Sequence, residues 1–381
     1  MMNKKVYQLI ILYLTLIFNV DINAFIYDDI PISYSYRIDT VNDKAVKLWT
    51  NYLQSRPDSI YENPFWLELD RNERFSFDPA RIWIFQNQEM LTTYKPMILS
   101  SEEVSPGLTM IKTLFINTSD ISKKVSPLAL YRVYAQLKDS EYVLKSALQV
   151  DTKSWESRKM NGLTFILSPL HKYSSSLARK SARFCDSLTA LFDLPDIEDA
   201  KIYVLTSKDE LASILGFDYF IAPPYGLTYA EKDIVLTALH SEWHPHELAH
   251  LIFRSYSKSH RFFQEGVATW CGGSLGQSLL ELTILLKKEN EKRGQSLSFK
   301  SVLQAEQNES LAYYTYGALI FKEVFERSGG RGVKNVLIEG ENYNIAIEEI
   351  IAKALGISVS DIDDFLEKSL HSFIKNNTIN N

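Results

Sequence analysis

The sequence predicts an α+β protein with a strand-rich amino-terminal part and a larger, mainly helical carboxyl-terminal part. Within residues 130–137, apolar side chains alternate with polar ones, which is typical of a sheet with one buried face. Beyond residue 265, apolar side chains instead recur at the three- and four-residue spacing of amphipathic helices. A polar stretch at residues 153–161 separates the two patterns, so we expect a domain boundary there.

Composition limits the function classes that the chain can serve. Of its 381 residues, 45% are hydrophobic and 23% are charged, which is ordinary for a globular protein large enough for two domains. The formal net charge of −6 argues against a broad basic surface, so nucleic acid is not an expected partner. The last residues, 376–381, form a polar tail rich in asparagine. Nothing in the sequence indicates an oligomeric state.

Residues 1–24 have the features of a secretory signal peptide. Lys4 and Lys5 supply the positive start, an apolar run follows at residues 6–20, and residues 22–24 form an acceptable cleavage site. The apolar run of fifteen residues is short for a membrane span, and no later stretch has the hydropathy to cross a bilayer. We therefore expect a secreted, periplasmic or otherwise extracytoplasmic protein that begins near Phe25, with an uncleaved anchor as the alternative.

Residues 25–156 are predicted to form an α+β domain that is rich in antiparallel strands. A helix is expected at residues 42–53, where apolar side chains share one face. Strands are expected from apolar and alternating runs at residues 81–85, 108–116, 130–137 and 141–150. This part contains no catalytic constellation, so we interpret it as an accessory domain.

Residues 157–375 are predicted to form the second domain, which begins with strands and continues with helices. The strands are expected at residues 163–167, 202–205, 227–230 and 233–239. A helix between the first two strands has an apolar face made of Leu177, Phe184, Leu188 and Leu191. Later helices are expected at residues 277–292, 308–327, 345–355 and 361–374, and Gly329 should end the second of these.

The residues that carry chemistry lie between the strands and the later helices. Five of the seven histidines fall within residues 240–260, and His246, Glu247 and His250 form the pattern H-E-x-x-H. Residues four apart on a helix point the same way, so the two histidines can hold one metal ion. Glu247 then projects beside that ion, where it can take a proton from water.

A catalytic zinc site needs three protein ligands, so a further ligand is required. Glu265 follows His250 after fourteen residues, in the sequence Glu-Gly-Val-Ala. The adjacent Gly266 is expected to let this backbone approach the first helix closely. We therefore predict one zinc ion per chain, held by His246, His250 and Glu265.

A competing pair of histidines, His240 and His244, is also four residues apart. Pro245 disfavours this pair, because a residue that precedes proline is pushed out of the α region. Proline is favoured at the first position of a helix, so the helix is expected to begin at Pro245 and to leave His244 outside. A surface helix that carries His246 and His250 without any metal ion is the structural alternative.

These motifs resemble those of the gluzincins, zinc peptidases whose ligands are the two histidines of H-E-x-x-H and a downstream glutamate. More narrowly, residues 161–375 resemble the peptidase MA-like domains, which are distantly related to the aminopeptidase-N-like enzymes. The resemblance implies a zincin-like fold, with a small, mostly antiparallel sheet and a helical lower half. The sequence lacks the G-x-M-E-N motif that clamps the substrate amine in those aminopeptidases, so it does not support exopeptidase specificity.

A third motif, Tyr314-Thr315-Tyr316-Gly317, is similar to the Y-x-K-G of aminopeptidase-N-like enzymes. The resemblance gives Tyr314 the role of stabilising the tetrahedral intermediate, although Tyr316 stands in place of the lysine. Tyr314 also lies on an inward helical stripe, where its ring can be buried while its hydroxyl reaches the site. Packing alone is the alternative for Tyr314, and Tyr316 is the alternative hydrogen-bond donor.

The other histidines and both cysteines receive no catalytic role. Cys185 and Cys271 lie in apolar helical contexts, where they can form a disulfide or stay as buried thiols. Outside the metal motif, we interpret His171 and His371 as structural. We expect a structural role for His244 and His260 as well, with a place in the lining of the cleft as the alternative.

The predicted activity is that of a secreted zinc metallopeptidase acting on a peptide or protein substrate. Glu247 is the expected general base, and Tyr314 is expected to donate a hydrogen bond to the developing oxyanion. The first alternative is a non-catalytic binding protein, a pseudopeptidase in which zinc only stabilises the fold. The second is an interaction module whose amino-terminal domain does the work.

Overall fold

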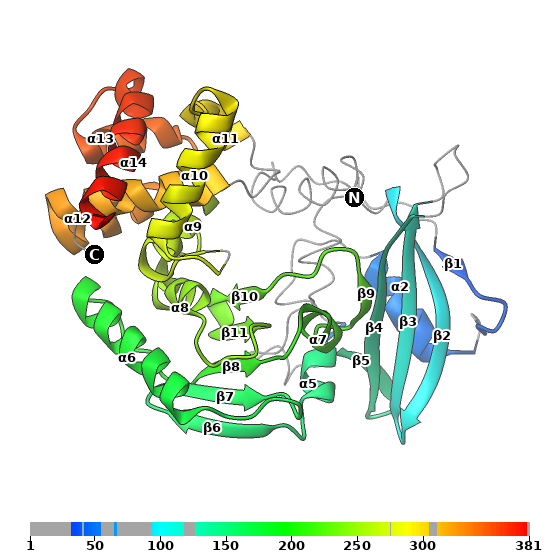
Figure 1. The fold of residues 1–381 in the computed structure, drawn as a ribbon. Coiled ribbons are helices and arrows are strands. Elements are labelled where there is room, and N and C mark those ends of the chain that lie inside the picture. Colours follow the sequence, from blue (N-terminus) through cyan, green and yellow to red (C-terminus); the bar gives the residue numbers. More distant parts are fainter. Residues whose placement is uncertain are drawn as a thin grey trace.

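The computed structural model describes residues 32–39, 42–54, 65–66, 93–117, 126–274, 276–304 and 311–378. The predicted signal peptide and the predicted strand at residues 81–85 lie outside these ranges. A six-stranded sheet lies at one end of the molecule and a group of helices at the other, with a five-stranded sheet between them (Figure 1). Helices and strands are thus largely segregated, which agrees with the predicted α+β class.

The first sheet has the order β1-β2-β3-β4-β5, with β9 also paired to β4. All its pairs are antiparallel except β1 with β2. Its strands are β1 (Ser33–Tyr34), β2 (Lys95–Ser105), β3 (Leu108–Asn117), β4 (Ser126–Lys138), β5 (Glu141–Lys145) and β9 (Phe217–Phe220). The helix α2 (Lys44–Leu53) packs on this sheet through Trp49, whose indole N–H donates to Thr113 Oγ1 at 2.8 Å.

The predicted strand at residues 141–150 is too long. The strand ends at Lys145, and Ala147–Asp151 forms the short helix α5. Ser146 has an extended backbone at the start of α5, and the buried Leu148 then packs into the core below the sheet. A short apolar run fits either a strand or a buried helix, so its periodicity did not distinguish the two.

The second sheet has the order β10-β11-β8-β7-β6, and its two inner pairs are parallel. Its strands are β6 (Glu156–Met160), β7 (Leu163–Leu167), β8 (Ala200–Val204), β10 (Gly226–Tyr229) and β11 (Ile234–Thr237). The prediction of a mostly antiparallel sheet is therefore wrong, since only the two outer pairs are antiparallel. The helix α6 (Ser175–Phe192) is the reason, because it carries the chain from β7 back to the start of a parallel β8.

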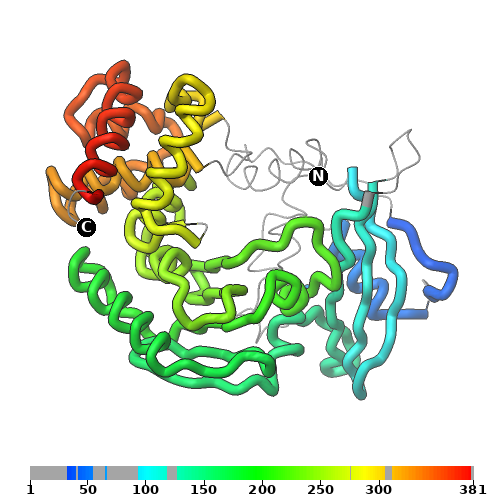
Figure 2. Tube along the Cα trace, viewed as in Figure 1, coloured from blue at the N-terminus to red at the C-terminus, as the bar shows by residue number. Residues whose placement is uncertain are grey.

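One apolar core joins the two sheets. It contains Tyr131 of β4 in the first sheet together with Leu236 of β11 in the second. The strand β9 reaches across from the second half of the chain, and its segment lies beside the first sheet in Figure 2. The opposite face of the second sheet, through Phe165 and Val235, belongs to another core that it shares with the helices.

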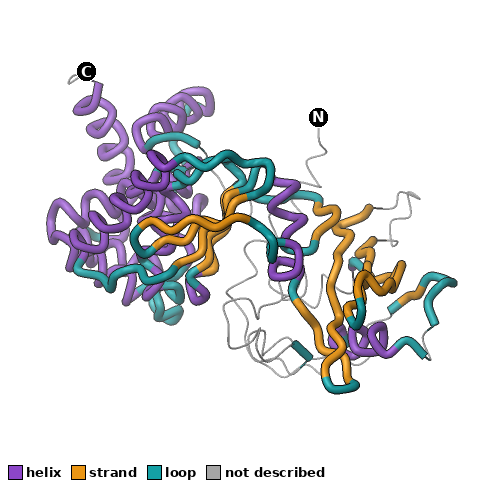
Figure 3. The backbone as a smooth tube through the Cα atoms, turned by 90° about the horizontal axis from the view of Figure 1, so that it is seen from below, coloured by secondary structure: helices purple, strands orange, loops and turns teal. Residues whose placement is uncertain are grey.

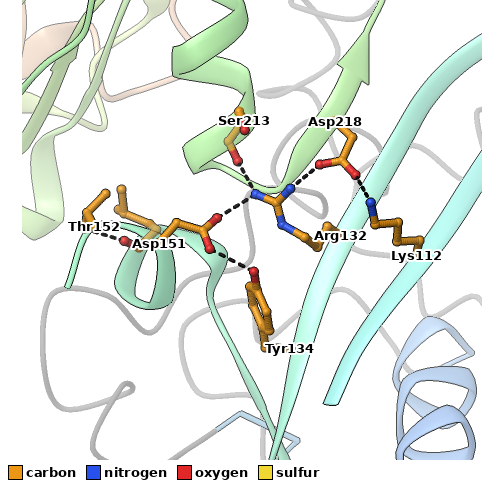
Figure 4. Close-up of polar contacts among 8 residues, drawn as sticks. Lys112, Arg132, Tyr134, Asp151, Thr152, Ser213 and Asp218 are labelled. Carbon is orange, nitrogen blue, oxygen red and sulfur yellow. Dashed lines mark hydrogen bonds and ion pairs between the residues drawn. The ribbon is translucent and has the colours of Figure 1, made fainter. Parts of the chain in front are cut away.

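Arg132 of β4 lies at the centre of a polar cluster that joins the first sheet to α5 (Figure 4). Its guanidinium pairs with Asp151 at the end of α5, at 2.6 Å, and with Asp218 of β9. Asp218 also binds Lys112 of β3 at 2.7 Å, while the Tyr134 hydroxyl donates to Asp151 at 2.8 Å. Burial and then the hydrogen bond to Asp151 raise the pKa of Tyr134 to about 12. The cluster thus joins β3 and β4 to α5 and β9.

We expect Arg132→Met to lower the free energy of unfolding by about 3 kcal/mol, because two carboxylates then lose their main cation. The Arg132 side chain is only 13% exposed, so water replaces the lost contacts poorly. Arg158→Met is the matched control, because Arg158 and its partner Glu156 are 58% and 54% exposed. Its expected loss is under about 1 kcal/mol. Equal losses for both variants in urea denaturation would contradict this prediction.

The helices after the second sheet form the other end of the molecule, shown in purple in Figure 3. They are α8 (Pro245–Ile252), α9 (Arg261–Gly272), α10 (Leu279–Arg293), α11 (Phe299–Gln304), α12 (Leu311–Glu339), α13 (Ile347–Leu355) and α14 (Ile362–Thr378). The predicted end of α12 at Gly329 is a break instead, where φ is 60° and ψ is −161° before helical geometry resumes. Within the described ranges, no helix combines the length and the hydropathy that a membrane span needs.

The buried face of α6 is shifted from the predicted one, although Phe184 and Leu188 of the predicted face pack partly buried against the helical core. Leu191 is 53% exposed, whereas Ala178, Ala182 and Cys185 are buried. The small side chains allow close packing of α6 against α8, so steric fit rather than hydropathy selects the inward face. Phe192 closes this contact, since its ring lies 5.0 Å from that of Phe253.

Candidate metal centre

The helix α8 begins at Pro245, as predicted, and contains both histidines of the H-E-x-x-H motif. His244 is the residue before the helix, with non-helical φ and ψ of −137° and 77°. His240 has a positive φ of 54°, and its ring lies 5.0 Å from that of His171. The competing pair of His240 and His244 therefore does not share a helical face.

Glu265 lies on α9, and the two helices approach each other through a glycine. A Cβ atom on Gly272 would lie 2.4 Å from the carbonyl carbon of Pro245 and 2.5 Å from the backbone nitrogen of His246. The predicted role of Gly266 is wrong, because a Cβ there would meet Gly317 of α12 at 2.9 Å instead. Gly272 therefore allows the start of α8 to pack closely against α9, while Gly266 allows close packing of α12 against α9.

Three ligand atoms converge where α8 and α9 meet. His246 Nε2 lies 3.1 Å from Glu265 Oε2 and 3.2 Å from His250 Nε2. His250 Nε2 and Glu265 Oε2 are 3.5 Å apart, so the three atoms form a triangle. Zinc bonds of about 2.0–2.2 Å in a tetrahedron place neighbouring ligand atoms about 3.3–3.6 Å apart. The triangle therefore fits one zinc ion. Among the described residues, no other group of three or more histidine, cysteine or acidic side chains has ligand atoms that all lie within 4.8 Å of one another.

The ring orientation of His246 suits metal binding. Its Nδ1 lies 2.7 Å from the carbonyl oxygen of Gly273, which can only accept, so Nδ1 carries the proton. That leaves Nε2 as the ring nitrogen that faces Glu265 and His250. A second hydrogen bond of this kind is usual for zinc-binding histidines, because it fixes the tautomer and the ring. Gly273 directly follows α9, so the helix that carries Glu265 also orients His246.

Glu265 has a second neighbour that the sequence reading missed. Arg261 Nε lies 3.5 Å from Oε1, the oxygen that is turned away from the two histidines. The pair has the i,i+4 spacing of a helical ion pair, so the signal was present in the sequence. Arg261 thereby leaves Oε2 of Glu265 for the metal site.

His246 and Glu265 shift each other's pKa values in opposite directions. Burial lowers the pKa of His246, but the carboxylate of Glu265 outweighs this and raises the pKa to about 9. Burial also raises the pKa of Glu265, but the two histidines hold it well below its usual range. Without a metal ion, His246 is therefore an imidazolium and Glu265 a carboxylate at neutral pH.

We expect zinc binding at pH 7 to release about one proton, because zinc displaces the proton on His246 Nε2. The apparent zinc affinity should consequently fall as the pH is lowered below about 9. Calorimetric titration in two buffers of different ionisation enthalpy measures the released proton. Binding heats that do not depend on the buffer would contradict the prediction.

Glu247 lies beside the ligand triangle and faces the sheet. Its side chain is buried, and the Thr228 hydroxyl of β10 donates to Oε2 at 2.7 Å. Gly226, two residues earlier on the strand, makes room for it, since a Cβ there would lie 2.6 Å from Oε1. Neither β10 residue was identified from the sequence. Hydrogen-bond partners nineteen residues away leave no periodic signal.

The two candidate tyrosines face different surroundings. The ring of Tyr314 lies 6.2 Å from the ring of His246 and edge-on to it. Tyr316 is almost fully buried, and burial raises its pKa, while Asn290 and Ser296 hydrogen-bond its side chain. The Tyr314 side chain therefore adjoins the ligand histidines, and the Tyr316 side chain packs towards α10.

Three of the remaining histidines have other partners. His171 Nε2 lies 2.9 Å from Glu242, His244 Nδ1 lies 3.0 Å from Thr237 Oγ1, and His260 accepts from the backbone of Phe262 at 3.2 Å. Burial lowers the pKa values of His244 and His260 to about 4.

The predicted alternative of free thiols holds for the two cysteines, since Cys185 and Cys271 do not form a disulfide. Burial raises the pKa of each thiol to about 12, so both stay protonated at neutral pH. Cys271 lies on α9 with Glu265, but it does not belong to the group formed by His246, His250 and Glu265.

Comparison with known proteins gives distant matches only. No family model and no curated protein matches the chain. Among solved structures, it is similar to a mutant M1 zinc metallopeptidase from Deinococcus radiodurans, at 12% identity and a TM-score of 0.36. That match covers 73% of this chain and 63% of the other. The same mutant bound to a Tyr-Ser-Ala substrate gives 12% identity, 73% and 62% coverage, and a TM-score of 0.35. The chain thus matches less than two thirds of the length of these structures.

Proposed function

We propose that the chain is a secreted, zinc-dependent metallopeptidase of the gluzincin type, with His246, His250 and Glu265 as the zinc ligands. The observation that carries the proposal is the triangle of ligand atoms, 3.1–3.5 Å on a side, with the buried Glu247 next to it on the same helix. Three protein ligands are the usual set in catalytic zinc sites, where the fourth position is kept for water or substrate.

The bound zinc ion would supply a Lewis acid that polarises the substrate carbonyl and makes water more acidic. Glu247 accepts a proton from the attacking water and passes it to the leaving amine. Tyr314, beside the His246 ring, donates a hydrogen bond to the oxyanion, a contact worth about 3 kcal/mol in comparable sites. Arg261 and the carbonyl of Gly273 keep Glu265 and His246 in their orientations.

A purely structural zinc site, as in a pseudopeptidase, is the second candidate function. It would use the same three ligands but has no use for Glu247. Burying a carboxylate is costly unless it is paired or hydrogen-bonded, and Glu247 has a single hydroxyl partner in the described part of the chain. An expensive group beside a metal site is more easily explained by proton transfer than by stability.

The test combines metal analysis with a hydrolysis assay. Purified protein is analysed for zinc and incubated with casein and a quenched-peptide library, with and without a zinc chelator. About one zinc per chain, and hydrolysis that the chelator stops and added zinc restores, is the expected result. Stoichiometric zinc without hydrolysis would favour the pseudopeptidase. Protein that binds no zinc would favour an interaction module built on the amino-terminal sheet.

A further inference from the structure

We infer that Thr228 is the positioning residue for Glu247, so that the edge strand β10 selects which carboxylate oxygen takes the proton. The inference rests on the proposed peptidase function. The Thr228 hydroxyl lies 2.7 Å from Oε2 of Glu247 and 3.0 Å from the backbone carbonyl oxygen of the same residue. A hydroxyl has one proton to donate, and the ionised carboxylate is the stronger acceptor.

This hydrogen bond leaves the two oxygens of Glu247 unequal. Oε2 is occupied by Thr228, whereas Oε1 accepts no hydrogen bond from the described residues. A general base must present an oxygen to water in a fixed direction. The hydrogen bond from Thr228 to Oε2 fixes the carboxylate plane and leaves Oε1 to accept the proton from water.

The strand supplies room as well as the hydrogen bond. Gly226 and Thr228 are two residues apart, so they face the same side of β10. A Cβ on Gly226 would lie 2.6 Å from Oε1 and 2.7 Å from Cγ of Glu247. Gly226 therefore makes room for Oε1 beside the strand, while Thr228 holds Oε2.

The spacing between the strand and α8 is fixed at a second point. Gly226 pairs with Thr237 of β11, and the Thr237 hydroxyl lies 3.0 Å from Nδ1 of His244, the residue before α8. The hairpin of β10 and β11 is thus attached to α8 at His244 and at Glu247. This double attachment sets the distance at which Thr228 reaches the carboxylate.

The test compares Thr228→Val, which removes the hydroxyl but keeps the shape, with Thr228→Ser, which keeps the hydroxyl. Loss of a hydrogen bond to a charged group predicts that the valine variant lowers kcat by about 10- to 100-fold. KM and zinc content should stay at wild-type values, and the serine variant should lie within about threefold of wild type. Thr164→Val is the matched control, because Thr164 donates to Asp199 at 3.0 Å on β7.

A second measurement separates positioning from general stability. In the Glu247→Gln background, adding Thr228→Val should cause no further loss of hydrolysis, because the base on which Thr228 acts is already gone. Wild-type kcat in the valine variant, a serine variant as impaired as valine, or independent losses in the double variant would each overturn the inference. If wild-type protein itself shows no zinc-dependent hydrolysis, the proposed function fails first, and the inference fails with it.

Discussion

Glu247→Gln should lower the turnover number of peptide hydrolysis by about 10²- to 10⁴-fold, because glutamine cannot accept the proton of the attacking water. The amide has nearly the same shape as the carboxylate and can still accept the hydrogen bond from Thr228. Glu247 is not among the three proposed zinc ligands, so the zinc content should stay at the wild-type value. Steady-state hydrolysis of a quenched peptide, together with metal analysis of the same sample, measures both quantities.

The control for this variant is Glu323→Gln, the same change at a partly exposed residue of α12, where it removes an i,i+4 ion pair with Arg327. It should leave hydrolysis unchanged. Wild-type activity in Glu247→Gln would remove this residue as the general base. Loss of zinc in the same variant would instead assign the carboxylate to metal binding.

Gly317→Ala is expected to lower the free energy of unfolding by about 2–3 kcal/mol, as overpacking typically does. The new Cβ would lie 2.8 Å from Cα of Gly266, where the backbones of α9 and α12 cross without any side chain between them. The helices must separate, and Glu265 directly precedes Gly266, so the third ligand moves away from the histidines. Zinc affinity should therefore fall together with stability, in urea denaturation and in competition with a chelator.

Gly330→Ala, in the same long helix, is the matched control. Outside its own helix, the new Cβ would lie nearest to Cδ1 of Phe192, at 3.3 Å, so that ring must shift by a few tenths of an ångström. Stability should fall less than in Gly317→Ala, and zinc affinity should stay unchanged. Unchanged stability in Gly317→Ala would show that α12 can shift at low cost. Lower stability with unchanged zinc affinity would show that the position of Glu265 does not depend on this crossing.

Several elements could be predicted because their signals are local. The strands β3 and β7 match the predicted ranges at residues 108–116 and 163–167 to within one residue. The start of α8 follows from Pro245 alone, since the ring of proline restricts both itself and the residue before it. These features depend on a few consecutive residues, so their patterns are visible without knowledge of the fold.

Other features were predicted wrongly because they depend on how elements pack. Hydropathy placed Leu191 on the buried face of α6, yet the small side chains of Ala178 and Ala182 are the ones that fit against α8. The parallel pairs of the second sheet depend on where the crossover through α6 returns the chain. Gly266 was matched with α8 rather than with α12, because a glycine signals a close approach without naming its partner.

The sequence by itself determined that His246, Glu247 and His250 lie on one helix, since a helical period of 3.6 residues puts the histidines on the same side. Only the tertiary structure decided which distant groups meet them. Glu265 reaches His246 across nineteen residues, and Thr228 reaches Glu247 across nineteen in the other direction. Those two contacts depend on how α8 packs against α9 and β10, at Gly272 and Gly226, where any side chain would clash. A periodic pattern along the sequence does not reveal which elements pack together.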